Sequence, residues 1–272
     1  MRLKNELIQS LLKLEELSDE RLEVMEWAVP VVAFGNVENS FFATLGINPS
    51  DREFINSKGK EIAGNERRFP TLNSLGIDSW SKINQEQIEL ILEMSESYFL
   101  NNPYDRWFKK LDFLITGAGA SYYFPSLSAC HLDLIPYATH EKWGNISKEK
   151  KETLLSESSD ILGSIINKSS IKVLLLNGRS VIENFERIAE VDFSIEEKNE
   201  WLLPRKNGKG VKGYSYEGIT KVIGNERLDN EIHVLGFNHN IQSSFGVTKE
   251  VELKIREWVS KKVAEYGKYC NP

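Results

Sequence analysis

The sequence predicts an α/β fold, with three α/β/α layers built around a mainly parallel, four-strand central sheet. Short apolar runs of strand length alternate along the chain with longer segments of helical spacing. Each apolar run ends in a polar loop, as strands of a parallel sheet do. The 272 residues are 40% hydrophobic and 27% charged, a composition that favours a packed core over disorder.

The first part of the chain is predicted to be helical. Leucines recur at helical spacing over residues 3–17, and a second short helix is expected from Asp19 until Pro30 stops it. We therefore expect an N-terminal helical extension over residues 1–39, followed by an α/β domain over residues 40–272.

Apolar runs and helical spacing then alternate in a regular order. The four expected core strands are residues 40–47, 128–136, 171–176 and 232–236. The helices expected between and after them are residues 85–100, 104–115, 149–167, 179–190 and 248–262, the last one capped by Thr248. An insertion is expected around residues 190–215, and Tyr214–Ile223 is a further candidate strand.

Composition excludes several classes of protein. The net charge of −6 argues against an extended nucleic-acid footprint, although the basic segment Arg205–Lys212 can hold a phosphate backbone locally. Cys130 and Cys270 are too few for a disulfide framework or a cysteine zinc cage, so the reducing cytoplasm is the default compartment. No apolar run approaches the roughly 18 residues of a membrane span, and the N-terminus predicts an amphipathic helix, not a signal peptide.

Ligands of open parallel sheets bind beyond the carboxyl ends of the strands. This rule selects the loops 48–51, 133–139, 177–180 and 238–244. Two side chains in them have alternative interpretations. Asn48 either starts a turn or positions a water or a substrate with its amide. His239 is either a structurally bonded loop histidine or a neutral donor to a departing oxyanion.

His131 and Asp133 share one face of their strand, so they form either a buried pair or part of the ligand crevice. A metal site that adds His140 and His239 is not favoured, because the chain has no HxxxH motif and no cysteine cluster. The run 116–121 lacks the third glycine of a dinucleotide fingerprint. We expect neither a metal nor a cofactor.

Phe69 follows two basic residues, Arg67 and Arg68, in a polar loop. An exposed aromatic ring here would stack on a base while the arginines contact phosphate, whereas a buried ring would only anchor the loop.

Taken in order, these loops resemble the uracil-DNA glycosylase superfamily. The run Gly46-Ile-Asn-Pro-Ser50 is similar to the Gly-x-Asn-Pro loop of the mismatch-specific and single-strand-selective branches. Residues 233–244 are similar to the strand that leads into His-Pro-Ser-Pro-x-Ser, with His239 and Ser244 kept and both prolines replaced. Residues 129–136 and 173–180 resemble the second and third strands of the family, so the resemblance covers about residues 40–262.

The resemblance implies a monofunctional DNA base N-glycosylase that acts in base excision without metal or cofactor. Asn48 would hold the attacking water, His239 would stabilise the departing base, and Phe69 would stack on the flipped base. Asp133, His131 and Asn240 are the other expected base contacts. The expected DNA contacts are Arg67, Arg68, Arg179, Lys206, Lys209, Lys212, Gln242, Ser243 and Ser244.

Asp133 departs from the family, which usually reads uracil with an asparagine amide. An ionised carboxylate only accepts hydrogen bonds, so it suits a base that bears an exocyclic amine. Keeping Asp133 protonated would cost several kcal/mol at neutral pH. A slipped alignment would make His131 or a nearby backbone group the reader instead. Two other functions stay open: an N-glycosidase for a free nucleoside or nucleotide, and an inactive nucleic-acid-binding or base-binding module of the same fold.

Overall fold

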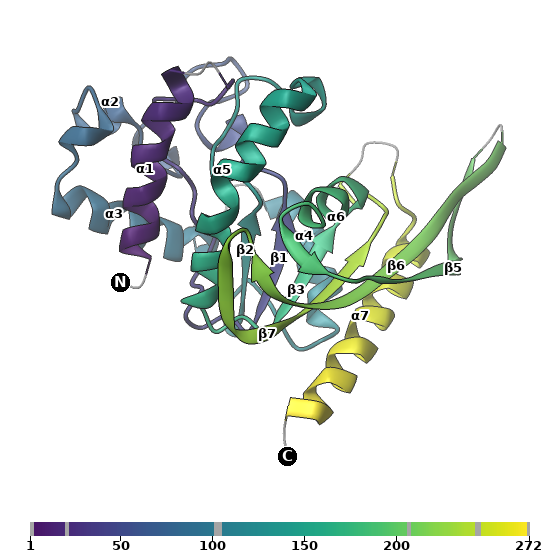
Figure 1. Ribbon diagram of the computed structural model, residues 1–272. Helices are drawn as coiled ribbons and strands as arrows, with labels where there is room; N and C mark the ends of the chain where they lie inside the picture. The colour runs from purple at the N-terminus through teal and green to yellow at the C-terminus, as the bar shows by residue number, and fades with distance from the viewer. Residues whose placement is uncertain (1–2, 20–21, 101–104, 206–207, 243–245, 271–272) are drawn as a thin grey trace.

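The computed structural model describes residues 3–19, 22–100, 105–205, 208–242 and 246–270. Within these residues one mixed sheet of seven strands forms the centre of the molecule, in the order β2-β1-β3-β7-β6-β4 with β5 paired to β6 (Figure 1). The parallel strands are β1 (Phe42–Gly46), β2 (Ala129–Asp133), β3 (Val173–Asn177) and β7 (Glu226–Phe237). The antiparallel strands are β4 (Ala189–Val191), β5 (Ser194–Arg205) and β6 (Gly208–Ile223).

The predicted four-strand parallel core is present, but the sheet is larger and mixed. Residues of the expected insertion around 190–215 form β4, β5 and the start of β6, all within the same sheet. The candidate strand Tyr214–Ile223 is confirmed as part of β6. The expected basic loop is wrong, because Arg205 pairs with Gly208 at the end of a β-hairpin.

Helices cover both faces of the sheet. Gly236 of β7 lies against Ile182 of a helix on one face of the sheet. His233, three residues earlier on the same strand, points to the opposite face and stacks on Tyr266 of the C-terminal helix. The α-helices are α1 (Lys4–Asp19), α2 (Leu72–Leu75), α3 (Gln85–Glu96), α4 (Asp105–Thr116), α5 (Lys148–Asn167), α6 (Arg179–Phe185) and α7 (Lys249–Cys270). None of these described helices is both long and apolar enough to cross a membrane.

Local sequence signals explain several helix starts. Asn84 and Gln87 form a capping box at α3, and Ser147 accepts a hydrogen bond from the third backbone N–H of α5. Thr248 accepts a bond from the N–H of Val251, so the predicted cap of the last helix is confirmed.

The second helix expected from Asp19 to Pro30 is wrong, since residues 22–30 contain no helix. This segment is irregular, with a turn at residues 26–27, and is largely buried. It bonds to the loop after β2, with the N–H of Met25 donating to Ala138 at 2.8 Å. Its apolar residues are buried on more than one side, which is why they do not show the spacing of a surface helix.

Strands β5 and β6 extend together beyond the rest of the molecule, as Figure 1 shows; we call this hairpin the arm. Most β5 side chains are exposed, but Trp201 is fully buried and packs edge-on against Trp258 of α7, with ring centroids 5.5 Å apart. This contact packs the arm against the helical layer.

We predict that Trp201→Ala lowers the free energy of unfolding by about 3 kcal/mol or more, because it removes a large buried aromatic side chain. The next residue, Leu202, is 46% exposed, so Leu202→Ala should change stability by only about 0.5 kcal/mol. Urea unfolding measures the stability of both variants, followed by circular dichroism instead of tryptophan fluorescence because one variant lacks a tryptophan. Equal losses in the two variants would contradict the anchoring role.

Candidate functional site

The carboxyl ends of the four parallel strands meet at one edge of the sheet, as the sequence predicted. Gly46 at the end of β1 lies beside Asp133 at the end of β2, and Asn177 at the end of β3 lies beside Phe237 of β7. The loops that carry Asn48 and His239 therefore leave the sheet on the same side.

Asn48 is held by its amide nitrogen. Nδ2 donates to the hydroxyl of Thr139 at 3.1 Å and lies 3.3 Å from two backbone carbonyl oxygens, those of Tyr137 and Pro49. The side chain is half-buried, and no described residue donates a hydrogen bond to its Oδ1. The amide is thus oriented with only its oxygen available to accept a bond.

His131 and Asp133 are brought together as the sequence predicted. The His131 Nε2 lies 3.5 Å from Asp133 Oδ1, while its Nδ1 shares a hydrogen bond of 2.6 Å with the Thr44 hydroxyl. Thr44 in turn shares a bond of 2.5 Å with the Tyr122 hydroxyl. The Asp133 side chain is 4% exposed. This is the buried-pair arrangement, extended into a chain of hydrogen bonds.

Gly46 makes the approach of Asp133 possible. A Cβ at this position would lie 2.3 Å from Asp133 Oδ1, closer than real Cβ atoms come, and 3.0 Å from His131 Nε2, which is tight. Any residue other than glycine would therefore force the Asp133 carboxylate to shift.

Phe69 is buried, in agreement with the loop-anchor interpretation. It is 1% exposed, stacks on Tyr98 at 5.5 Å with an interplanar angle of 16°, and meets Phe34 edge-on at 5.5 Å. In this structure the ring has no open face for a base, so the expected stacking would require Phe69 to leave this aromatic cluster.

Glu53 is a buried carboxyl group that the sequence did not single out. It is 4% exposed, the Tyr98 hydroxyl lies 3.1 Å from both of its oxygens, and the Arg68 guanidinium lies 3.6 Å away. Burial raises the pKa of Glu53 to about 7 and outweighs the opposing effect of Arg68, while the nearby Asp133 raises it further. The residue lies in a polar stretch without periodicity, so no sequence pattern marks it.

Glu53 makes the stability of the protein depend on pH. Because the folded-state pKa is raised above its ordinary value of 4.5, its contribution to stability is present at low pH and is lost as pH rises to about 7. We expect wild type to lose about 2–3 kcal/mol more between about pH 5 and 8 than Glu53→Gln does.

Denaturant unfolding at both pH values measures this loss. The exposed Glu190 provides the control variant Glu190→Gln, which should retain the wild-type pH dependence. If Glu53→Gln follows the same pH curve as wild type, Glu53 does not titrate as the structure requires.

His239 is buried and hydrogen-bonded away from the loop of Asn48. Its Nε2 donates to the backbone carbonyl of Trp201 in the arm at 2.7 Å, and burial lowers its pKa. A neutral imidazole that donates from Nε2 has no second N–H. To stabilise a departing base, His239 would first have to break its bond to Trp201.

The rest of the loop after β7 folds back on itself. Asn240 is exposed and accepts a bond from the N–H of Gln242, whose side-chain oxygen accepts a bond of 2.9 Å from Asn177. Ser243 and Ser244 lie outside the described residues.

The expected DNA contacts differ in how they are paired. Arg179 forms an ion pair with Glu183, and Lys212 forms one with Glu197, each at 2.8 Å. Lys209 is exposed on β6, and Lys206 lies outside the described residues. Exposed pairs of this kind are weak, so both cations could still exchange their partner for a phosphate.

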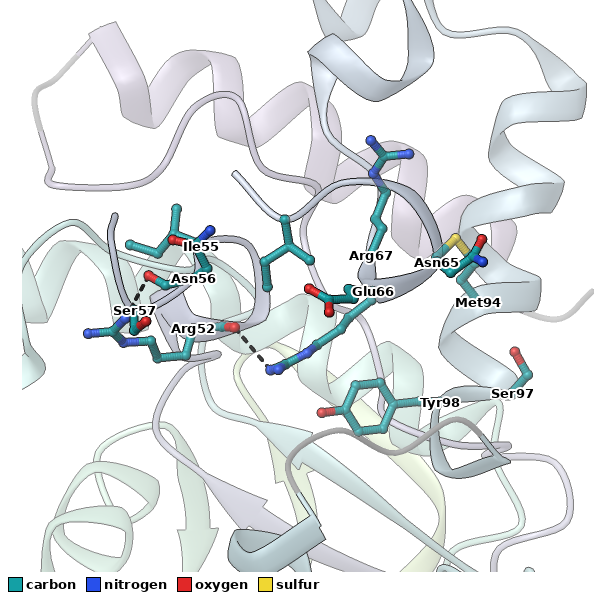
Figure 2. A pocket seen from close by; sticks show the side chains of 12 residues that line it. Arg52, Ile55, Asn56, Ser57, Asn65, Glu66, Arg67, Met94, Ser97 and Tyr98 are labelled. Carbon is teal, nitrogen blue, oxygen red and sulfur yellow. Dashed lines mark hydrogen bonds between the residues drawn. The ribbon is translucent and has the colours of Figure 1, made fainter. Parts of the chain in front are cut away.

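Arg67 and Arg68 line a cavity of about 990 Å³ together with Arg52 (Figure 2). No group of three His, Cys, Asp or Glu side chains within the described ranges could hold a metal ion. Neither a family model nor a curated protein matches the chain. The likeness to uracil-DNA glycosylases therefore rests on the four motifs alone.

Proposed function

We propose that the chain is a monofunctional DNA base N-glycosylase of the uracil-DNA glycosylase type, which hydrolyses the bond between a base and its deoxyribose. The observation that carries the proposal is the fixed amide of Asn48 at the carboxyl end of β1. Its nitrogen is engaged by protein acceptors, which leaves its oxygen to accept a hydrogen bond from a water. The two cysteines favour the reducing cytoplasm as its compartment.

In the proposed reaction the water bound to Asn48 attacks the anomeric carbon of a flipped nucleotide. The new C–O bond forms as the C–N bond breaks, the bonding electrons leave with the base, and the proton of the water passes to solvent. Asn48 orients the water and is not required to hold the proton. The base must be extruded, because neither the sugar nor the base edge is reachable in a stacked duplex.

We expect Asn48→Ala to reduce single-turnover base release by about 100-fold or more, because the water loses its orienting partner. Oligonucleotides that contain uracil, hypoxanthine, xanthine or alkylated bases are the substrates, and alkaline cleavage at abasic sites is the readout. Asn230 is exposed on β7 away from the carboxyl end, so Asn230→Ala is the matched control.

Two results would count against this mechanism. An Asn48→Ala variant with the wild-type rate would remove Asn48 from it. Wild-type protein that binds DNA but releases no base from any substrate would instead identify an inactive binding module.

Asp133 is proposed to select the base, which requires its side chain, 4% exposed beside His131 in this structure, to become accessible to the flipped base. A carboxylate accepts hydrogen bonds from an exocyclic amine but offers nothing to the O4 of uracil. We predict that Asp133→Asn shifts the preference of base release towards uracil by about tenfold or more relative to wild type. The ratio of rates on uracil and amine-bearing bases, measured for both proteins, tests this. An unchanged ratio would exclude Asp133 as the reader.

A free nucleoside or nucleotide is the second candidate substrate. The ion pairs of Arg179 and Lys212 and the net charge of −6 favour it over an extended DNA contact. Salt titration separates the two, because DNA affinity falls steeply with salt when several phosphates are engaged. An absence of DNA binding at low salt would favour the small substrate.

A further inference from the structure

The cavity beside Arg67 has a composition suited to an anion. Three guanidinium groups line it, from Arg52, Arg67 and Arg68, all in the segment after β1. Figure 2 shows Arg52 and Arg67 on this segment and Tyr98 on the turn that follows α3. Guanidinium groups recognise phosphate through paired N–H donors, so a cavity lined by three arginines is a candidate site for one.

Two of the arginines are fixed in place by the backbone. Arg52 donates from Nη1 to the carbonyl of Asn56 at 2.7 Å, and Arg68 donates from Nη1 to the carbonyl of Arg52 at 3.0 Å. Figure 2 marks both bonds as dashed lines. Each contact restrains one arginine side chain before any ligand arrives, which lowers the entropic cost of binding one.

Arg67 has an unsatisfied donor. Its Nε is buried and has no hydrogen-bond partner, and no described residue forms an ion pair with its guanidinium. A buried donor without a partner costs about 1–3 kcal/mol, more when the group is charged. An anion in the cavity would be bound by the terminal nitrogens of Arg67, because the buried Nε is closed to solvent.

The negative charge around the cavity does not cancel these arginines. Glu66 also lines it, and Glu53 lies behind Arg68 and Tyr98. With a pKa of about 7, Glu53 carries only part of a charge at neutral pH. Three cations thus face less than two carboxylate charges.

Part of the cavity wall is apolar. Ile55, Ile62, Met94 and the Tyr98 ring lie alongside the arginines, and the volume of about 990 Å³ suits a small organic ligand. Inorganic phosphate alone would leave this wall uncovered, whereas a phosphate attached to a sugar and base would contact it.

We infer that the arginine cavity binds the terminal phosphate monoester of a nucleotide. The doubly charged monoester matches the charge of the guanidinium cluster better than a singly charged diester does. The phosphate can belong to a free nucleotide or to the 5′ end of a DNA strand. This site goes beyond the proposed glycosylase reaction and does not depend on it, since binding here requires no bond cleavage.

Isothermal titration calorimetry of the full chain tests the site. The probes are deoxyadenosine monophosphate, deoxyadenosine, inorganic phosphate, and one short oligonucleotide with and without a 5′-phosphate, all at one salt concentration. We expect each phosphorylated probe to bind at least about tenfold more tightly than its unphosphorylated partner. A mononucleotide that binds more tightly than the phosphorylated oligonucleotide assigns the phosphate to a free nucleotide, and the reverse order assigns it to a DNA end.

Arginine variants locate the binding. Arg67→Gln should weaken binding of the nucleotide by about tenfold or more, whereas Arg227→Gln, on an exposed residue of β7, should leave it unchanged. Arg52 is exposed, so Arg52→Gln gives a second test if Arg67→Gln does not fold. Three results would overturn the inference. They are equal binding of deoxyadenosine and its monophosphate, equal effects of the Arg67 and Arg227 variants, and no binding of any phosphate probe at millimolar concentration.

Discussion

At the carboxyl end of this sheet, ionisable groups are buried next to an aromatic cluster. Their need for polar neighbours restricts how the surrounding loops can be arranged. Glu53, His131 and Asp133 are nearly inaccessible to water, and each is stabilised by a specific polar neighbour. Removing charges from water is costly unless such partners are in place. The positions of Thr44, Tyr98 and Arg68 are therefore coupled to those of the acids, and the loops after β1 and β2 cannot be rearranged independently.

The core strands could be predicted because their side chains are apolar on both faces. A run such as Val173–Asn177 lies in the middle of a parallel sheet, and its composition alone indicates this. Strand β5 could not be predicted in the same way, since most of its residues are exposed and many of them are charged. Its extended form comes from pairing with β6, a long-range interaction that leaves no periodic pattern in the sequence.

The candidate site also combines contacts that the sequence predicts with contacts that it does not. Strand alternation predicts that His131 and Asp133 lie next to each other, and the structure confirms this. The partners of Asn48 and His239 are distant in sequence. Asn48 bonds to Tyr137 and Thr139, which are 89 and 91 positions away. His239 bonds to Trp201, which is 38 positions away. Motif spacing carries no information on such contacts. For the same reason the burial of Phe69 could not be decided from its polar neighbours.

The bond between His239 and Trp201 is one of several contacts between the arm and the end of β7, where Ser215 of β6 pairs with Phe237. The arm projects from the sheet, and Gly213 on its second strand would place a Cβ 3.2 Å from the same imidazole, so the ring is enclosed by the hairpin. A change in the position of the arm would therefore alter the surroundings of the imidazole at the end of β7.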